Sequence, residues 1–131
     1  MAQNWRYRAT WGAICGGLAG CAPAAPDAQT PDYRGSEAIW LADDLLSVRA
    51  RMRGAQGAGD VARYGDCALA RYAQAQGFGY ARPLRSVVDV EAGLWQSDAV
   101  YTISRSEPRG SRVIDTVETL QACAADGIPA A

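Results

Sequence analysis

The sequence predicts an α+β fold, a two-layer sandwich in which one amphipathic helix packs on a small, mostly antiparallel sheet in the order β-α-β-β-β. Three observations support this prediction: several segments alternate apolar and polar residues, one segment carries an apolar stripe at helical spacing, and turn residues separate them. The domain is expected over residues 38–131. A signal peptide (1–20) and a disordered linker (21–37) are expected before it.

The N-terminal residues are typical of a bacterial export signal. Arg6 and Arg8 precede an apolar run of about a dozen residues, which suits a signal peptide and is too short to span a bilayer. The run ends at residues 18–21, Leu-Ala-Gly-Cys, which resemble the lipobox of bacterial lipoprotein precursors. This resemblance implies cleavage before Cys21 and a diacylglyceryl group on its thiol. The alternative is an incidental cysteine in an ordinary secretory signal.

A lipidated Cys21 would anchor the chain to a membrane of the bacterial cell envelope, facing the periplasm. Each buried acyl methylene contributes about 0.8 kcal/mol, so two or three acyl chains give stable binding. Ala22 stands where an aspartate would be expected for inner-membrane retention, and by resemblance to the enterobacterial sorting rule this favours the outer membrane over the inner. Residues 21–37 are predicted to be a tether, because three prolines and several polar residues oppose regular structure.

The first predicted strand covers residues 44–53, where apolar residues alternate with serine and arginine. A glycine-rich segment ends it, and Asp60 is expected to cap a helix that runs to about Gln76, with Gly77 as its C′ residue. One face of that helix is apolar, and it consists of Val61, Tyr64, Ala68, Leu69, Tyr72 and Ala75.

Three more strands are predicted in the second half of the chain. The first is strongest over residues 84–90, and Pro83 places it toward an edge of the sheet. Residues 98–104 alternate regularly, and residues 113–119 are expected to pair antiparallel with them across a turn-rich hairpin loop. A single helical turn is expected over residues 120–125.

The four cysteines are expected to play different roles. Cys15 lies in the signal peptide and Cys21 is the lipid site, which leaves Cys67 and Cys123 as an even pair in an oxidising compartment. We predict a disulfide between them, and closing a loop of about 55 residues would contribute about 4 kcal/mol. A buried pair of free thiols and half of a metal site are the alternatives. The metal site is disfavoured, because the chain has no histidine and no Cys-x-x-Cys spacing.

The composition excludes several classes of active site. The 131 residues contain neither histidine nor lysine, so Ser-His-Asp and Cys-His sites and Schiff-base chemistry are absent. The net charge of −1 lacks the basic excess typical of nucleic-acid binding. The acid pairs Asp43 with Asp44, and Asp89 with Glu91, are interpreted as solvated turn and strand-end residues, since so small a domain offers little room for a cleft. The sequence therefore predicts no enzyme, no cofactor and no metal site.

Candidate partner contacts come from one strand and one tryptophan. Arg49, Arg51 and Arg53 share a strand face and could bind phosphate, lipopolysaccharide or an acidic partner. The preferred interpretation is a solvated face whose charges discourage aggregation. Most aromatic residues, Trp40 among them, are core candidates. Trp95 follows a turn, and a partly exposed Trp95 would be the best single anchor for a partner.

A family resemblance rests on four segments, which are YGDCALARYA (64–73), GFGYAR (77–82), DAVYTIS (98–104) and CAADGIP (123–129). Together they resemble a family of small, uncharacterised proteobacterial lipoproteins over more than half of the chain. The resemblance implies that Cys67 pairs with Cys123, and it supplies no activity.

The functional prediction is therefore a membrane-anchored, non-enzymatic docking or sensing domain that binds an envelope protein or polymer. The alternative is a small-ligand or lipid-binding module that uses the groove between helix and sheet. A closed, packed helix–sheet interface would favour protein docking, whereas an apolar cavity of a few hundred Å³ would favour a ligand.

Overall fold

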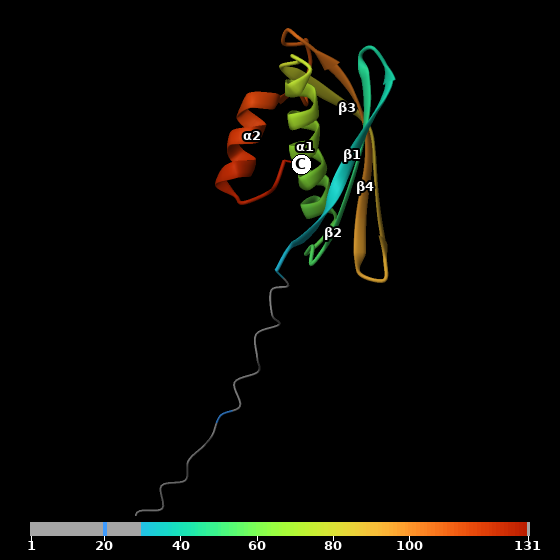
Figure 1. Cartoon of the computed structure of the whole chain (residues 1–131), viewed down its shortest axis with the longest axis vertical. Coiled ribbons are helices and arrows are strands. Elements are labelled where there is room, and N and C mark those ends of the chain that lie inside the picture. Colours follow the sequence, from blue (N-terminus) through green and yellow to red (C-terminus); the bar gives the residue numbers. More distant parts are fainter. Residues whose placement is uncertain (1–19, 21–29, 131) are drawn as a thin grey trace, which may run out of the picture.

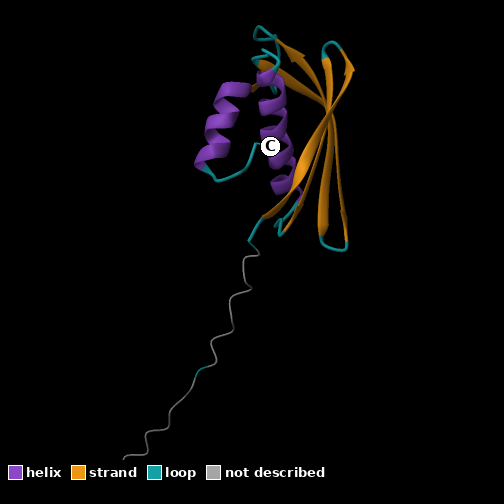
Figure 2. Cartoon of the chain, in the orientation of Figure 1, coloured by secondary structure: helices purple, strands orange, loops and turns teal. Residues whose placement is uncertain are grey.

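The computed structural model describes residue 20 and residues 30–130. Its elements are β1 (Asp32–Ala42), β2 (Leu45–Arg53), α1 (Ala58–Ala75), β3 (Tyr80–Glu91), β4 (Leu94–Ser104), β5 (Ile114–Asp115) and α2 (Thr116–Ala125). The five strands form one antiparallel sheet in the order β1-β2-β4-β3-β5. Helix α1 lies along one face of this sheet, and α2 lies on the side of α1 that faces away from the sheet (Figures 1 and 2). The α+β class is confirmed, but the predicted order and the single helix are wrong.

The first correction is strand β1, which begins at Asp32, inside the segment predicted to be a linker to residue 37. The last proline of the predicted linker is Pro31, and from Asp32 onward the chain pairs with β2, which follows a tight turn at residues 43–44. The strand is interrupted near Gly35, where the register shifts and φ is 105°, a value that favours glycine. Cys21 and nearly all of the predicted tether and signal peptide lie outside the described residues.

The second correction concerns residues 113–119, which do not pair with β4. They supply the two-residue strand β5, which pairs with β3 instead, and then the start of α2. The side chain of Asp115 accepts hydrogen bonds from the backbone N–H groups of Val117 and Glu118, at 3.0 and 3.1 Å. This N-cap starts a helix within a sequence whose alternation predicted a strand.

Two smaller expectations concern helix α1 and strand β3. The N-cap of α1 is Gly57 rather than Asp60, which lies in the first turn and accepts a hydrogen bond from the backbone N–H of Gln56. Strand β3 carries Pro83 opposite Tyr101 and shifts register there. Strand β5 pairs only with the first two residues of β3, so the edge position predicted from the proline is correct from Pro83 onward.

The main core lies between α1 and the sheet and is fully closed. Its largest buried side chains are Leu46, Val48, Met52, Val61, Tyr64, Leu69 and Tyr101. Gly65 brings the helix close to β4, because a Cβ atom there would lie 3.3 Å from the Ser97 hydroxyl oxygen. The apolar stripe predicted for α1 is buried from Val61 to Leu69, whereas Tyr72 is half-buried and Ala75 is exposed.

The predicted disulfide between Cys67 and Cys123 is present and joins α1 to α2, with 6.1 Å between the two Cα atoms. Only Thr116 and Cys123 of α2 are buried, and Val117 is exposed. Helix α2 therefore depends on this covalent link and on its N-terminal anchor. The Thr116 hydroxyl donates to the carbonyl oxygens of Phe78 and Gly79, at 3.3 and 3.1 Å.

Candidate functional site

Strand β1 forms one edge of the sheet, and its first half is protected. Asp32 and Arg34 form an ion pair at 2.8 Å, which places charge on the edge. The irregularity at Gly35 interrupts the strand, and the Tyr72 hydroxyl of α1 donates to the backbone carbonyl of Ser36 at 3.1 Å. Charge, bulge and an occupied carbonyl all oppose the addition of another strand.

The second half of β1, residues 38–42, carries no charge, and no described side chain binds its carbonyl groups, although its register with β2 shifts again between Trp40 and Ala42. We call it the open edge segment. Its sequence is Ala-Ile-Trp-Leu-Ala, without a charge. Ile39, Trp40 and Leu41 are 53, 41 and 55% exposed. Among the described residues this segment pairs only with β2. Consecutive large apolar side chains on an unpaired edge are uncommon in a soluble domain, because they promote association.

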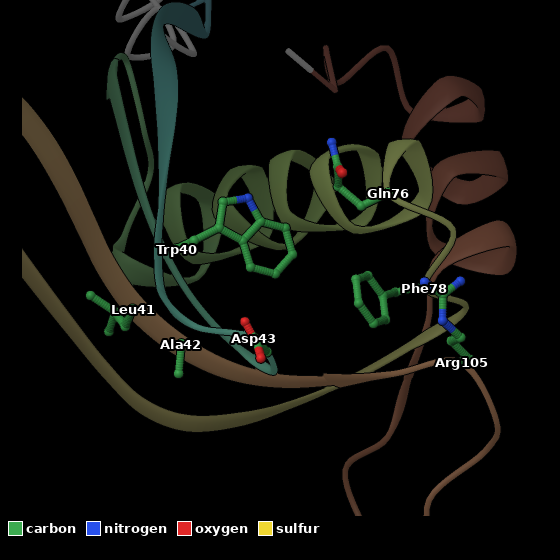
Figure 3. A pocket seen from close by; sticks show the side chains of 7 residues that line it. All are labelled: Trp40, Leu41, Ala42, Asp43, Gln76, Phe78 and Arg105. Atoms are coloured by element: carbon green, nitrogen blue, oxygen red, sulfur yellow. The ribbon is translucent and has the colours of Figure 1, made fainter.

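An open cavity of about 570 Å³, the aromatic pocket, lies beside this segment. Its lining residues are Trp40, Leu41, Ala42, Asp43, Gln76, Phe78 and Arg105. The rings of Trp40 and Phe78 lie 5.9 Å apart between centroids, and the Arg105 guanidinium lies 4.8 Å from the Phe78 centroid. Figure 3 shows the two rings on either side of the hollow, with Arg105 next to Phe78.

The end of helix α1 positions Phe78 in the pocket. Gly77, at φ 83°, ends the helix as predicted, and the N–H of Phe78 donates back to the Ala73 carbonyl at 3.0 Å. A Cβ atom at Gly77 would lie 2.9 Å from the Arg105 guanidinium, so the glycine also makes room for that side chain. The pocket therefore depends on the C-terminal geometry of the helix.

The rim of the pocket carries one charge of each sign. Arg105 donates to the Gly77 carbonyl at 3.3 Å, and within the described chain it makes no ion pair. Asp43 at the β1–β2 turn is likewise without an ion pair there. An approaching group therefore meets apolar walls and an exposed guanidinium able to bind a carboxylate.

The aromatic pocket lies at the end of the domain opposite to the N-terminal end of β1. In Figure 1, β1 starts at the bottom of the domain and reaches the β1–β2 turn at the top. The strand has 11 residues. At about 3.3 Å per residue, it separates the pocket from the start of the domain by roughly 30 Å.

The predicted arginine row lies on the sheet face that no described helix covers. Arg49 contacts Glu37 and Asp98 at 3.3 and 3.2 Å, and Arg51 contacts Glu37 at 3.4 Å. Arg53 donates to the Ala92 carbonyl at 2.9 Å. Ion pairs therefore partly neutralise Arg49 and Arg51, whereas Arg53 makes no ion pair among the described residues.

The structure does not bring Trp95 to the arginine row. Trp95 is half-buried at the start of β4 and packs against a core cluster that consists of Ala50, Met52, Val61 and Tyr64. Trp40 is the more exposed tryptophan, and the core assignment for it is wrong. A signal for it was present, because the prolines end at Pro31 and an apolar run ending in two aspartates follows.

Asp66 and Tyr101 form a polar pair inside the domain that the sequence did not predict. The Tyr101 hydroxyl donates to the Asp66 carboxylate at 2.8 Å. Burial raises the pKa of Asp66, and this hydrogen bond partly opposes the rise. Burial and the neighbouring Asp66 carboxylate raise the pKa of Tyr101 well above its ordinary value. The pair therefore joins α1 to β4 through a side-chain hydrogen bond.

The part of the chain that the structure describes offers neither a metal cluster nor a membrane-spanning helix. No group of three or more His, Cys, Asp or Glu side chains there could hold a metal ion. No helix there is both long and apolar enough to cross a membrane.

Residues 33–127 match the family described as the YNQ4 C-terminal domain. The chain belongs to this family. It is also 38% identical over 115 residues to an "Uncharacterized 26.9 kDa protein in nqo8 5'region" of Paracoccus denitrificans. That match covers 83% of this chain and 45% of the Paracoccus protein, so the chain spans less than half the length of this YNQ4-domain relative. No solved structure matches.

Proposed function

We propose that this YNQ4 domain is a membrane-anchored docking domain of the bacterial cell envelope. It is held through a lipid on Cys21, faces the periplasm, and binds another envelope protein. The contact surface is the open edge segment together with the aromatic pocket. The observation that carries the proposal is the exposure of Ile39, Trp40 and Leu41 on β1, whose outer edge pairs with no other described strand. Covering such side chains stabilises a complex by about 25 cal/mol per Å² of apolar surface.

The position of the pocket supports a protein partner over the anchoring membrane. A tether attached at the N-terminal end of β1 presents the opposite end of the domain, about 30 Å away by strand length, to the periplasmic space. There the aromatic rings and the Arg105 guanidinium meet soluble or membrane-embedded proteins rather than the lipids that hold Cys21. Outer-membrane anchorage remains part of the proposal on the strength of Ala22.

The small-ligand alternative has one specific observation in its favour. The groove between α1 and the sheet is filled by buried side chains, which supports docking over a ligand at that place. The aromatic pocket, however, has about 570 Å³ and two aromatic walls, which suits a small apolar ligand in size. Its wide opening toward solvent supports a larger partner that also covers Leu41 and Ile39.

Anchorage is tested by fractionating cells that express the full chain with Cys21→Ala, using Cys15→Ala as the matched control. We expect labelled palmitate to be incorporated into the wild type and the control, and both to sediment with membranes. The Cys21→Ala protein should lose the label and the sedimentation. Membrane attachment that survives Cys21→Ala would refute the anchor.

Docking is tested by placing a photo-crosslinking amino acid at Leu41 in living cells. Val87 is the matched control, because it is also an exposed apolar residue but lies on β3, toward the opposite edge of the sheet. We expect one discrete protein adduct from position 41 that disappears when Trp40→Ala is added, and none from position 87. Equal labelling at both positions, or adducts with lipid alone, would refute docking.

A further inference from the structure

We propose that the partner adds a strand to the sheet: an extended segment pairs with residues 38–42, places a large apolar side chain between Trp40 and Phe78, and brings a carboxylate to Arg105. This inference rests on the proposed function and specifies the chemistry of its partner. The occupant is an extended apolar peptide with an acidic residue, carried by another protein.

The backbone of β1 provides the first argument. A strand that pairs on one side only presents every second N–H and C=O group to solvent, and these groups form a template for another strand. Within the described residues β1 pairs only with β2. The bulge at Gly35 and the Ser36 carbonyl bound by Tyr72 stop such pairing in the first half. The available template is therefore the open edge segment, which keeps a regular register with β2 from Ala38 to Trp40 and shifts register between Trp40 and Ala42.

The side chains provide the second argument. An added strand projects its residues alternately to the two faces of the sheet. Those on the helix side reach the aromatic pocket, which Trp40 and Leu41 line, and those on the other side lie next to the exposed Ile39. Both faces of the added strand thus meet apolar surface, so the recognised segment is apolar at consecutive positions.

The charge at the pocket rim provides the third argument. The Arg105 guanidinium stacks on Phe78, and its one hydrogen bond within the described residues is to the Gly77 carbonyl. Its other N–H groups are therefore available as donors. A carboxylate near the apolar anchor can accept from those donors as a charge-assisted pair. This complementarity selects acidic over basic segments, because a basic group at the same place would be repelled.

A second copy of this chain fits the same edge less well. If residues 38–42 of two copies paired antiparallel about Trp40, Asp43 of each copy would face the partner's Glu37. Like charges directly opposite in a sheet are destabilising. A different protein with its own extended segment avoids this repulsion.

The experiment uses the full chain in detergent micelles and a phage-displayed library of random twelve-residue peptides. We expect the selected peptides to contain consecutive apolar residues and an acidic residue. Their affinity should fall at least tenfold for the Trp40→Ala variant and stay unchanged for Val87→Ala, the matched exposed control. Arg105→Gln should weaken the binding of the acidic peptides at least threefold more than it weakens the binding of the same peptides with the acidic side chain replaced by its amide.

Backbone pairing is tested on synthetic copies of the selected peptides that carry one N-methyl group each. N-methylation at alternate positions should weaken binding at least tenfold, and at the intervening positions much less. Equal effects at all positions, or binding that survives Trp40→Ala, would overturn strand addition.

If the adduct from Leu41 forms in cells while N-methylation has no effect, docking stands and strand addition fails. If the adduct is also absent, the proposed function fails as well. A dimer of the full chain that Ile39→Lys dissolves would identify a second copy as the occupant and overturn this proposal.

Discussion

The two edges of the sheet differ in how their unpaired backbone is protected. At the β3 edge, β5 pairs with Tyr80 and Ala81, Pro83 removes a donor, and the register shifts beyond it. Charged residues then follow, and they are Arg85, Asp89 and Glu91. At the β1 edge, the charges and the bound carbonyl stop at residue 37, and only a second register shift follows, between Trp40 and Ala42. The same domain therefore carries a well-protected edge and an edge whose last five residues are open.

This contrast indicates that the open edge segment has a different task from the rest of the surface. Exposed valines and a leucine also occur at the β3 edge, which are Leu84, Val87 and Val90. There they are interspersed with charges and follow a proline, so no uninterrupted apolar template forms. Exposure alone does not distinguish the two edges, whereas the combination of exposure, missing charge and available backbone does.

The largest expected effect concerns stability, and it tests whether the β1 edge keeps its function when helix α2 loses its covalent link. Replacing both Cys67 and Cys123 with alanine should lower the free energy of unfolding by about 4 kcal/mol, because the 56-residue separation closes a long loop. Urea unfolding followed by circular dichroism measures the loss. The variant that remains folded should still give the Leu41 adduct, because α2 lies on the side of α1 that faces away from the sheet. Loss of the adduct in folded protein would show that the open edge depends on α2.

The second effect concerns binding and tests the open edge directly. Trp40→Ala should cost about 2 kcal/mol of binding free energy, as for a central aromatic anchor, and change folding stability far less. Peptide titration measures the first quantity, and urea unfolding measures the second. Val87→Ala at the protected edge serves as the control. Similar binding losses from both variants would erase the difference between the edges.

The third effect concerns the hydroxyl that protects the first half of β1. Tyr72→Phe removes the hydrogen bond to the Ser36 carbonyl and should cost about 1 kcal/mol of unfolding free energy. It should also increase amide hydrogen exchange near Ser36, whereas amides at residues 38–42 should be unchanged. Unchanged exchange near Ser36 would mean that the bulge alone protects this half.

The smallest effect is a pH dependence on the β3 side. Asp66 lines a cavity with Pro83, Arg85 and Arg112, and burial raises its pKa above that of the unfolded chain. Its stabilising contribution is therefore complete below a pH of about 3.9 and is lost as the pH rises through the folded pKa. Asp66→Asn should remove this loss, so urea unfolding should show the variant gaining relative to wild type from pH 4 to pH 7. A constant difference across this range would contradict the raised pKa.

Sequence periodicity predicted the elements that bury one face along most of their length. Helix α1 was predicted within three residues at its N-terminal end and within one at its C-terminal end, because an apolar stripe along the helix is a strong local signal. Strand β1 was missed, because three prolines upstream made the whole segment resemble a linker. The start of α2 was missed because residues 113–119 alternate like a strand, while the capping geometry of Asp115 decides for a helix.

The candidate site could be predicted only in part for a similar reason. Trp40, Phe78 and Arg105 lie far apart in the sequence, and each belongs to a different segment. Trp40 sits on the helix side of β1, which usually means burial, but helix α1 ends at Ala75 and leaves Trp40 partly uncovered. Sequence reasoning therefore placed it in the core.

The sequence by itself determined the α+β class, helix α1, the alternating strands β2 and β4, and the cysteine pair, because these depend on local periodicity and on residue chemistry. The tertiary structure alone decided that β4 lies between β2 and β3 and that β1 is an edge. Strand order is a matter of pairing between distant segments, which no local pattern records. The open edge and the aromatic pocket beside it follow from that order, since a strand is exposed only when no other strand takes the place next to it.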